Sequence, residues 1–199
     1  GKGGKEFHRV KIMAYQRPDL FQKILEVTSA SVIAYLNAQI QAGADAVMIF
    51  DTWGGSLTPR AFKTFSCDNL KQICHGLIRE VDGEVIPRVV FTKGGGQWLE
   101  ALAGTGADAL GIDWSTDLGA ARAKVGDRVA LQGNMDPAVL LTNPDVVKKE
   151  VGNVLSDFGS GSGHVFNLGH GVSQFTPPEN VLELVEAVHE QSRSYHPAV

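Results

Sequence analysis

The stretch Ala46-Val-Met-Ile-Phe-Asp-Thr-Trp-Gly-Gly55 decides the fold class, because polar and glycine residues directly follow an unbroken apolar run. Short apolar runs of this kind are typical of strands buried on both faces of a parallel sheet. The residues after the run then lie at the carboxyl end of the strand, where α/β proteins bind their ligands. The stretch therefore predicts an α/β protein with polar side chains gathered at one edge of its sheet.

The same strand-then-helix pattern recurs along the chain. Further strands are expected at residues 85–91, 109–112, 129–132 and 164–166. Helices are expected at residues 18–25, 28–41, 58–81, 97–103, 118–124 and 143–158, and from a Thr176–Glu179 capping box onward. About five strand–helix units in strict alternation indicate a parallel sheet.

A doubly wound sheet and a (β/α)8 barrel both fit this alternation. The barrel is favoured because polar, glycine-bearing segments follow every strand at its carboxyl end. A barrel needs eight units and typically about 250 residues, so a chain of 199 residues is expected to hold only about the last five. No proline- or serine-rich linker divides it, and residues 1–199 are expected to form one domain with a mobile lead-in at residues 1–11.

The composition excludes several classes of partner. A net charge of −4 offers no electrostatic attraction for nucleic acid or an anionic membrane, and no apolar run approaches the roughly 20 residues that span a bilayer. Cys67 and Cys74 lie about two turns apart in one expected helix, too far apart for a disulfide. We therefore expect a reduced, cytoplasmic protein.

His170 is a candidate binding residue, because Gly169 and Gly171 bracket it just after the strand at residues 164–166. Glycine on both sides lets the backbone turn sharply, so that the imidazole can face outward from the corner. The alternative, a histidine hydrogen-bonded into a loop, is about equally compatible with the sequence.

The other strand ends supply carboxylates, a lysine, amides and two indoles, which suit a carboxylate-bearing ligand with a flat, apolar body. Each candidate also has a purely structural interpretation. Asp51 and Asp113 could cap turns, and Trp53 and Trp114 could pack at the rim of the barrel. Lys93 could be a solvated charge, and Thr52 could be a turn residue. We prefer that interpretation for the aspartates and the lysine. These candidates are Asp51, Thr52, Trp53, Lys93, Asp113 and Trp114.

Known motifs narrow the chemistry further. The sequence contains no P-loop, no G-x-G-x-x-G and no G-x-S-x-G, and its histidines and cysteines lack metal-ligand spacing. The remaining possibility is acid–base chemistry without a metal or an organic cofactor.

Five motifs in register resemble the bacterial type of the uroporphyrinogen decarboxylase family. They are Phe50-Asp-Thr-Trp-Gly-Gly, Phe91-Thr-Lys-Gly-Gly-Gly, Gly111-Ile-Asp-Trp, Leu131-Gln-Gly-Asn-Met-Asp-Pro and Phe166-Asn-Leu-Gly-His-Gly. The resemblance implies a homodimeric (β/α)8 barrel of porphyrin and haem biosynthesis in the cytoplasm. Such a lyase decarboxylates the four acetate arms of uroporphyrinogen III to give coproporphyrinogen III, without a cofactor, after protonation of a pyrrole carbon.

The resemblance also implies that Thr52 and His170 contact the tetrapyrrole substrate. The family's arginine-rich segment, its pyrrole-binding aspartate and its active-site tyrosine have no counterpart before Val27. The chain therefore resembles the carboxyl-terminal portion of the family, has no assigned catalytic residue of its own, and is expected to be inactive alone.

Two alternatives stay open. The chain could be a non-catalytic fragment that at most binds tetrapyrrole. It could also be a relative of the corrinoid methyltransferases, which would require a zinc-binding cysteine at a strand end, whereas Cys67 and Cys74 are expected within a helix. An open five-stranded sheet would in addition expose its edges, which favours dimerisation or completion by further barrel units.

Overall fold

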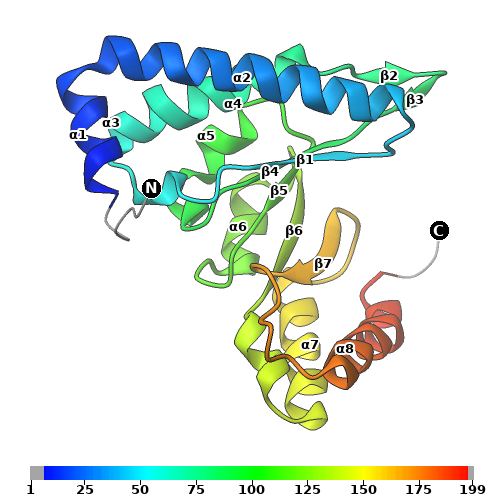
Figure 1. The fold of residues 1–199 in the computed structure, drawn as a ribbon. Coiled ribbons are helices and arrows are strands. Elements are labelled where there is room, and N and C mark those ends of the chain that lie inside the picture. Colours follow the sequence, from blue (N-terminus) through cyan, green and yellow to red (C-terminus); the bar gives the residue numbers. More distant parts are fainter. Residues whose placement is uncertain (1–6, 197–199) are drawn as a thin grey trace.

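The protein, seen in a computed structural model that describes residues 7–196, contains a five-stranded parallel sheet (Figure 1). Its strands, in spatial order, are β1 (Val47–Phe50), β4 (Arg88–Phe91), β5 (Ala109–Gly111), β6 (Ala130–Met135) and β7 (His164–Leu168). Each strand pairs with the next one along the chain, without the reversal that defines a doubly wound sheet. This order is that of consecutive units of a (β/α)8 barrel, which confirms the expected fold class.

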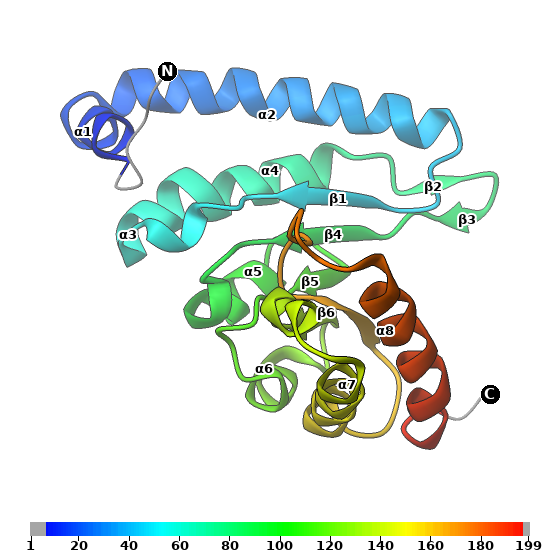
Figure 2. The ribbon, with the colours of Figure 1, turned by 60° about the horizontal axis from the view of Figure 1, so that its bottom comes forward.

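Helices surround the outer side of the curved sheet (Figures 1 and 2). They are α1 (His8–Gln16), α2 (Pro18–Gln41), α3 (Pro59–Phe62), α4 (Asp68–Gly76), α5 (Leu99–Ala103), α6 (Leu118–Val125), α7 (Pro144–Phe158) and α8 (Pro178–Gln191). One continuous apolar core forms between the sheet and helices α2 to α8. The sheet therefore has one face packed against helices and a second face directed away from them.

The inner face of the sheet is not covered by the described residues. In β1, Val47 and Ile49 are buried against the helices, whereas Phe50 on the opposite face is 65% exposed. Val165 and Asn167 on β7 are exposed as well. The expectation of strands buried on both faces is thus wrong for the edge strands, because the residues described here pack on only one side of the sheet.

Two expected elements before the first strand differ in the structure. The helices expected at residues 18–25 and 28–41 are a single helix, α2, since no glycine or proline interrupts the sequence between them. Within the expected lead-in, α1 begins at His8, and residues 1–6 lie outside the described part.

The helix expected over residues 58–81 ends early and is interrupted by a π-helical segment, Lys63–Cys67. Asn37 of α2 ends it: its amide donates to the Gly76 carbonyl at 3.0 Å and its side-chain oxygen accepts from the Ile78 amide at 2.8 Å. The chain then forms a hairpin from β2 (Glu80–Val81) and β3 (Glu84–Val85). Val85 therefore belongs to this hairpin, not to the strand expected over residues 85–91.

The carboxyl-terminal helices follow the sequence pattern more closely. Asn143 caps α7 by accepting from the Val146 amide at 3.1 Å, and Gly159 ends the helix. The capping box expected at Thr176 is wrong, because α8 begins after Pro177 without a side-chain cap. Asn180, buried in its first turn, instead donates to the Leu140 and Thr142 carbonyls.

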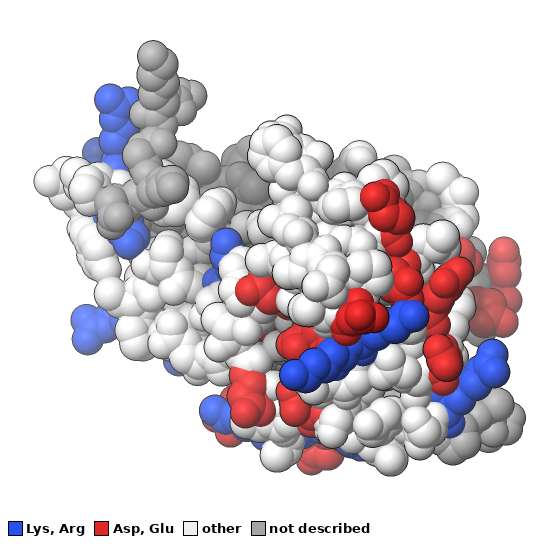
Figure 3. All heavy atoms as spheres, turned by 90° about the horizontal axis from the view of Figure 1, so that it is seen from below, with Lys and Arg blue, Asp and Glu red and all other residues white. Residues whose placement is uncertain are grey.

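Charge is mixed on the face that carries α7 and α8. Figure 3 shows acidic side chains gathered there with lysine and arginine between them, and no continuous basic surface on that side. None of the helices in residues 7–196 combines the length and the apolar character that crossing a membrane requires.

Candidate active site

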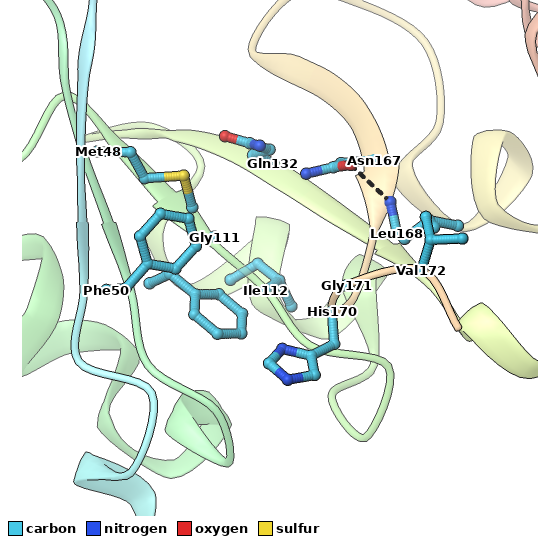
Figure 4. A pocket seen from close by; sticks show the side chains of 11 residues that line it. Met48, Phe50, Gly111, Ile112, Gln132, Asn167, Leu168, His170, Gly171 and Val172 are labelled. Atoms are coloured by element: carbon cyan, nitrogen blue, oxygen red, sulfur yellow. Dashed lines mark hydrogen bonds between the residues drawn. The ribbon is translucent and has the colours of Figure 1, made fainter. Parts of the chain in front are cut away.

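A pocket of about 400 Å³ lies on the uncovered inner face of the sheet (Figure 4). Figure 4 shows Phe50 and His170 at one end of this pocket, with the amides of Gln132 and Asn167 at the other. Its lining residues come from β1, β4, β5, β6, β7 and the segments that follow them; they are Met48, Phe50, Phe91, Gly111, Ile112, Gln132, Asn167, Leu168, His170, Gly171 and Val172. This inner-face pocket is mainly apolar, with a few polar groups that could orient a ligand.

His170 faces the inner-face pocket from the segment that follows β7. Its imidazole stacks on the Phe91 ring at 5.9 Å between centroids and 18° between planes, and it lies 6.2 Å from the Trp114 ring. The side chain is exposed, so an aromatic surface supports the imidazole while one side stays accessible to a ligand. Of the two interpretations of His170, the structure favours an outward-facing side chain.

The glycines beside His170 do not supply the backbone freedom that was expected of them. Neither has a positive φ, so the corner does not depend on a left-handed backbone. A Cβ on Gly169 would lie 2.4 Å from the Trp114 backbone nitrogen, whereas one on Gly171 would meet nothing within 4 Å. Gly169 is required because two backbone segments pass in contact, and this contact fixes the position of His170 beside Trp114.

Thr52 lies in a second hollow, of about 310 Å³, at the carboxyl rim of the sheet. This rim hollow is lined by Thr52, Trp53, Gly55, Ser56, Lys93, Gly94, Asp113, Trp114 and Ser115. Thr52 and His170 therefore occupy neighbouring hollows rather than one, and Trp114, which lines the rim hollow and approaches the His170 ring, connects them.

Asp113 caps the turn that follows it, as expected, whereas the Asp51 side chain accepts hydrogen bonds from residues distant in the chain. Asp113 is 2% exposed; it accepts from the Ser115 amide at 2.9 Å, from the Ser115 hydroxyl, and from the Gly94 amide of the neighbouring segment. Asp51 accepts from the Ser66 hydroxyl and, at 3.5 Å, from Thr92. Burial raises the pKa of the Asp51 carboxyl above its ordinary value, although both hydroxyls lower it.

Lys93 differs from the expected solvated charge. Its Nζ lies 4.8 Å from the centroid of the Trp114 ring and 5.6 Å from that of Trp53. Sequence reasoning missed this arrangement because the two indoles follow different strands. The presence of a tryptophan after each of β1 and β5, on either side of the strand that precedes Lys93, was the available signal.

No metal site is evident in the described part of the chain. Residues 7–196 contain no group of three or more histidine, cysteine, aspartate or glutamate side chains that could hold an ion. Both cysteines are free, and they lie in the π-helical segment and in α4 rather than at a strand end.

The ordered parallel sheet, its outer helices and a pocket at the carboxyl ends of its strands define part of a (β/α)8-barrel protein. Residues 1–191 match the family described as "Uroporphyrinogen decarboxylase (URO-D)", and the chain belongs to this family.

Curated relatives agree with this assignment. The chain is 59% identical to the uroporphyrinogen decarboxylase of Methylobacillus flagellatus and 58% identical to that of Nitrosomonas europaea, in each case over 98% of this chain and 55% of the relative. It therefore spans about half the length of the curated relatives it matches, in agreement with the expected carboxyl-terminal portion.

A solved structure shows the same fold. A methyltransferase from Methanosarcina mazei superposes with a TM-score of 0.79 over 91% of this chain and 52% of its own, at 24% sequence identity. At this level of identity the likeness concerns the fold alone.

Proposed function

We propose that this chain is the carboxyl-terminal part of a uroporphyrinogen decarboxylase that converts uroporphyrinogen III to coproporphyrinogen III. The observation that supports the proposal best is His170 stacked beside an apolar pocket at the carboxyl ends of the strands. Apolar walls suit the flat pyrrole rings of such a substrate, while the few polar groups suit its carboxylate arms.

In this proposal, the residues of the chain bind and orient the substrate. The Phe50 and Phe91 rings pack against a pyrrole face and exclude water from it. The His170 ring contacts the substrate within the inner-face pocket, and the Thr52 hydroxyl donates to a carboxylate arm that reaches the rim hollow. Protonation of a pyrrole carbon then turns the ring into an electron sink, so that the bond to the departing carboxylate can break.

The acid that supplies this proton is not assigned to a residue of this chain. Asp51 and Asp113 already accept internal hydrogen bonds and serve to fix the segments after β1 and β5. The chain alone is therefore proposed to bind tetrapyrrole without turning it over. The proposal includes a single domain over residues 1–199 and, for the whole molecule, a cytoplasmic homodimer.

A direct test compares binding and turnover for the purified 199-residue chain. Binding of uroporphyrin, the stable oxidised form of the substrate, is followed by fluorescence. Turnover of uroporphyrinogen III is followed anaerobically by oxidising the products and separating the porphyrins. Binding without loss of acetate carboxyl groups supports the proposal, normal turnover contradicts the assignment of this chain as inactive alone, and absent binding shows that this half does not build the pocket.

A further inference from the structure

Lys93 is held in place by contacts from both neighbouring strand-end segments. The Gly94 amide donates to the buried Asp113 carboxylate, and Gly55 packs so closely that a Cβ there would lie 2.1 Å from the Lys93 carbonyl oxygen. The backbone that presents the lysine is therefore fixed, unlike that of a typical surface loop.

The ammonium group lies against the faces of two indoles, at 4.8 Å from the Trp114 centroid and 5.6 Å from that of Trp53. Indole faces attract a cation through the ring quadrupole, which restricts where the flexible side chain can lie. The charge is thereby positioned in the rim hollow, which also contains Thr52.

This charge has no carboxylate partner within residues 7–196. The ion pairs of the described part involve other lysines and arginines. The two nearby strand-end carboxylates, of Asp51 and Asp113, already accept hydrogen bonds from hydroxyls and amides. A half-buried ammonium that is held by indoles and lacks a counter-ion is suited to an anionic group from a ligand.

We propose that Lys93 binds one carboxylate arm, acetate or propionate, of a pyrrole ligand, while Trp53 and Trp114 hold its ammonium in place. The identity of this ligand rests on the proposed function. Trp114 also approaches the His170 ring at 6.2 Å, so a ligand whose flat body lies in the inner-face pocket can extend an arm past this indole. Lys93 is then a specificity-determining residue at the rim, next to Thr52.

The test uses two probes and three variants of the 199-residue chain. Uroporphyrin reports on the whole pocket, and a monopyrrole with one acetate and one propionate arm reports on the rim hollow alone through tryptophan emission. Lys93→Gln removes the charge, Lys93→Arg keeps it, and Lys71→Gln, at an exposed position of α4, is the matched control.

We expect Lys93→Gln to weaken uroporphyrin binding about tenfold at low salt and less than about twofold in 1 M salt, because screening removes the charge contribution. Lys93→Arg is expected to retain most of the affinity, and Lys71→Gln all of it. A loss that is the same at low and high salt would assign Lys93 a merely structural role and overturn the inference.

The outcomes separate this inference from the proposed function. If the unmodified chain binds uroporphyrin and Lys93→Gln binds it equally well, the inference fails and the function stands. If the chain binds only the monopyrrole, and Lys93→Gln abolishes this binding, the inference stands. The proposal that this chain builds a tetrapyrrole pocket is then wrong. If neither probe binds, both are wrong.

Discussion

The His170 imidazole stacks on Phe91, a residue of β4, although His170 itself follows β7. The stacking therefore crosses two intervening strands of the sheet. Gly111 on β5 makes it possible, because a Cβ there would lie 2.9 Å from the Phe91 ring. A residue without a side chain thus leaves space for the aromatic surface on which the histidine rests.

Replacement of this histidine is expected to affect binding more than stability. His170→Ala should weaken uroporphyrin binding about tenfold, because the imidazole contacts the ligand, while the free energy of unfolding changes by less than about 0.5 kcal/mol for an exposed side chain. Fluorescence titration and urea unfolding measure the two effects. His189→Ala, at an exposed position of α8, serves as the control, and an equal loss of binding in both variants would contradict the role of His170.

Asp51 should make the stability of the chain depend on pH in a defined direction. Burial raises its pKa above the ordinary value of 3.8, so the folded state binds this proton more tightly than the unfolded state does. The associated stability is fully present below the pKa that Asp51 has in the unfolded chain. It is lost as the pH rises through the pKa that Asp51 has in the folded chain. Asp51→Asn avoids this loss, so its stability relative to the unmodified chain should increase as the pH rises above 3.8.

Urea unfolding of both proteins at several pH values checks the Asp51 prediction. Because both proteins contain the same other carboxylates, the difference between their free energies of unfolding reports on residue 51 alone. An Asn variant whose relative stability fell as the pH rose would show that the Ser66 and Thr92 hydrogen bonds, and not burial, control this carboxyl.

Asp108 should show the opposite pH dependence. Partial burial alone would raise its pKa, but hydrogen bonds from the Arg79 side chain and from the backbone and side chain of Arg88 together lower it. Its stabilising contribution is therefore present at neutral pH and is lost as the pH falls through the folded pKa. Asp108→Asn should cost about 1–3 kcal/mol at pH 7, because it removes charge-assisted hydrogen bonds.

The Asp108 prediction is checked by urea unfolding at pH 7 and at pH values below 3.8, where the difference between Asp108→Asn and the unmodified chain should narrow. Asp127→Asn, at an exposed position after α6, is the matched control and should be nearly neutral. A difference that stayed constant with pH would mean that Asp108 contributes through shape rather than charge.

Local sequence patterns sufficed to locate the five strands of the parallel sheet and α7, because these depend on apolar runs and on signals such as Asn143 and Gly159. The hairpin at residues 80–85 was missed, although Asp82-Gly83 is a typical hairpin turn, because Ile78 and Val81 also fit the helical spacing of the preceding segment. The end of α4 depends on Asn37 of α2, a contact that no local pattern reveals.

The candidate site, too, could be predicted only in part from the sequence. The strand ends predicted which residues gather at the rim, but the sequence could not show that Thr52 and His170 lie in separate hollows. Nor could it show that Lys93 meets indoles from two different segments. Each of these relationships joins residues far apart in the chain and is set by the curvature of the sheet.

The two glycines beside His170 provide the sharpest test of how the site is built. Gly169→Ala places a methyl group against the backbone of Asp113 and Trp114, which cannot move aside as the end of a flexible side chain could. We expect a destabilisation of about 1–3 kcal/mol together with weaker uroporphyrin binding, because His170 and Trp114 must separate. Gly171→Ala meets open space and should leave stability within about 0.5 kcal/mol. Similar effects of the two substitutions, measured by thermal unfolding and titration, would indicate that the turn needs glycine for backbone freedom rather than for the close approach of Gly169 to Trp114.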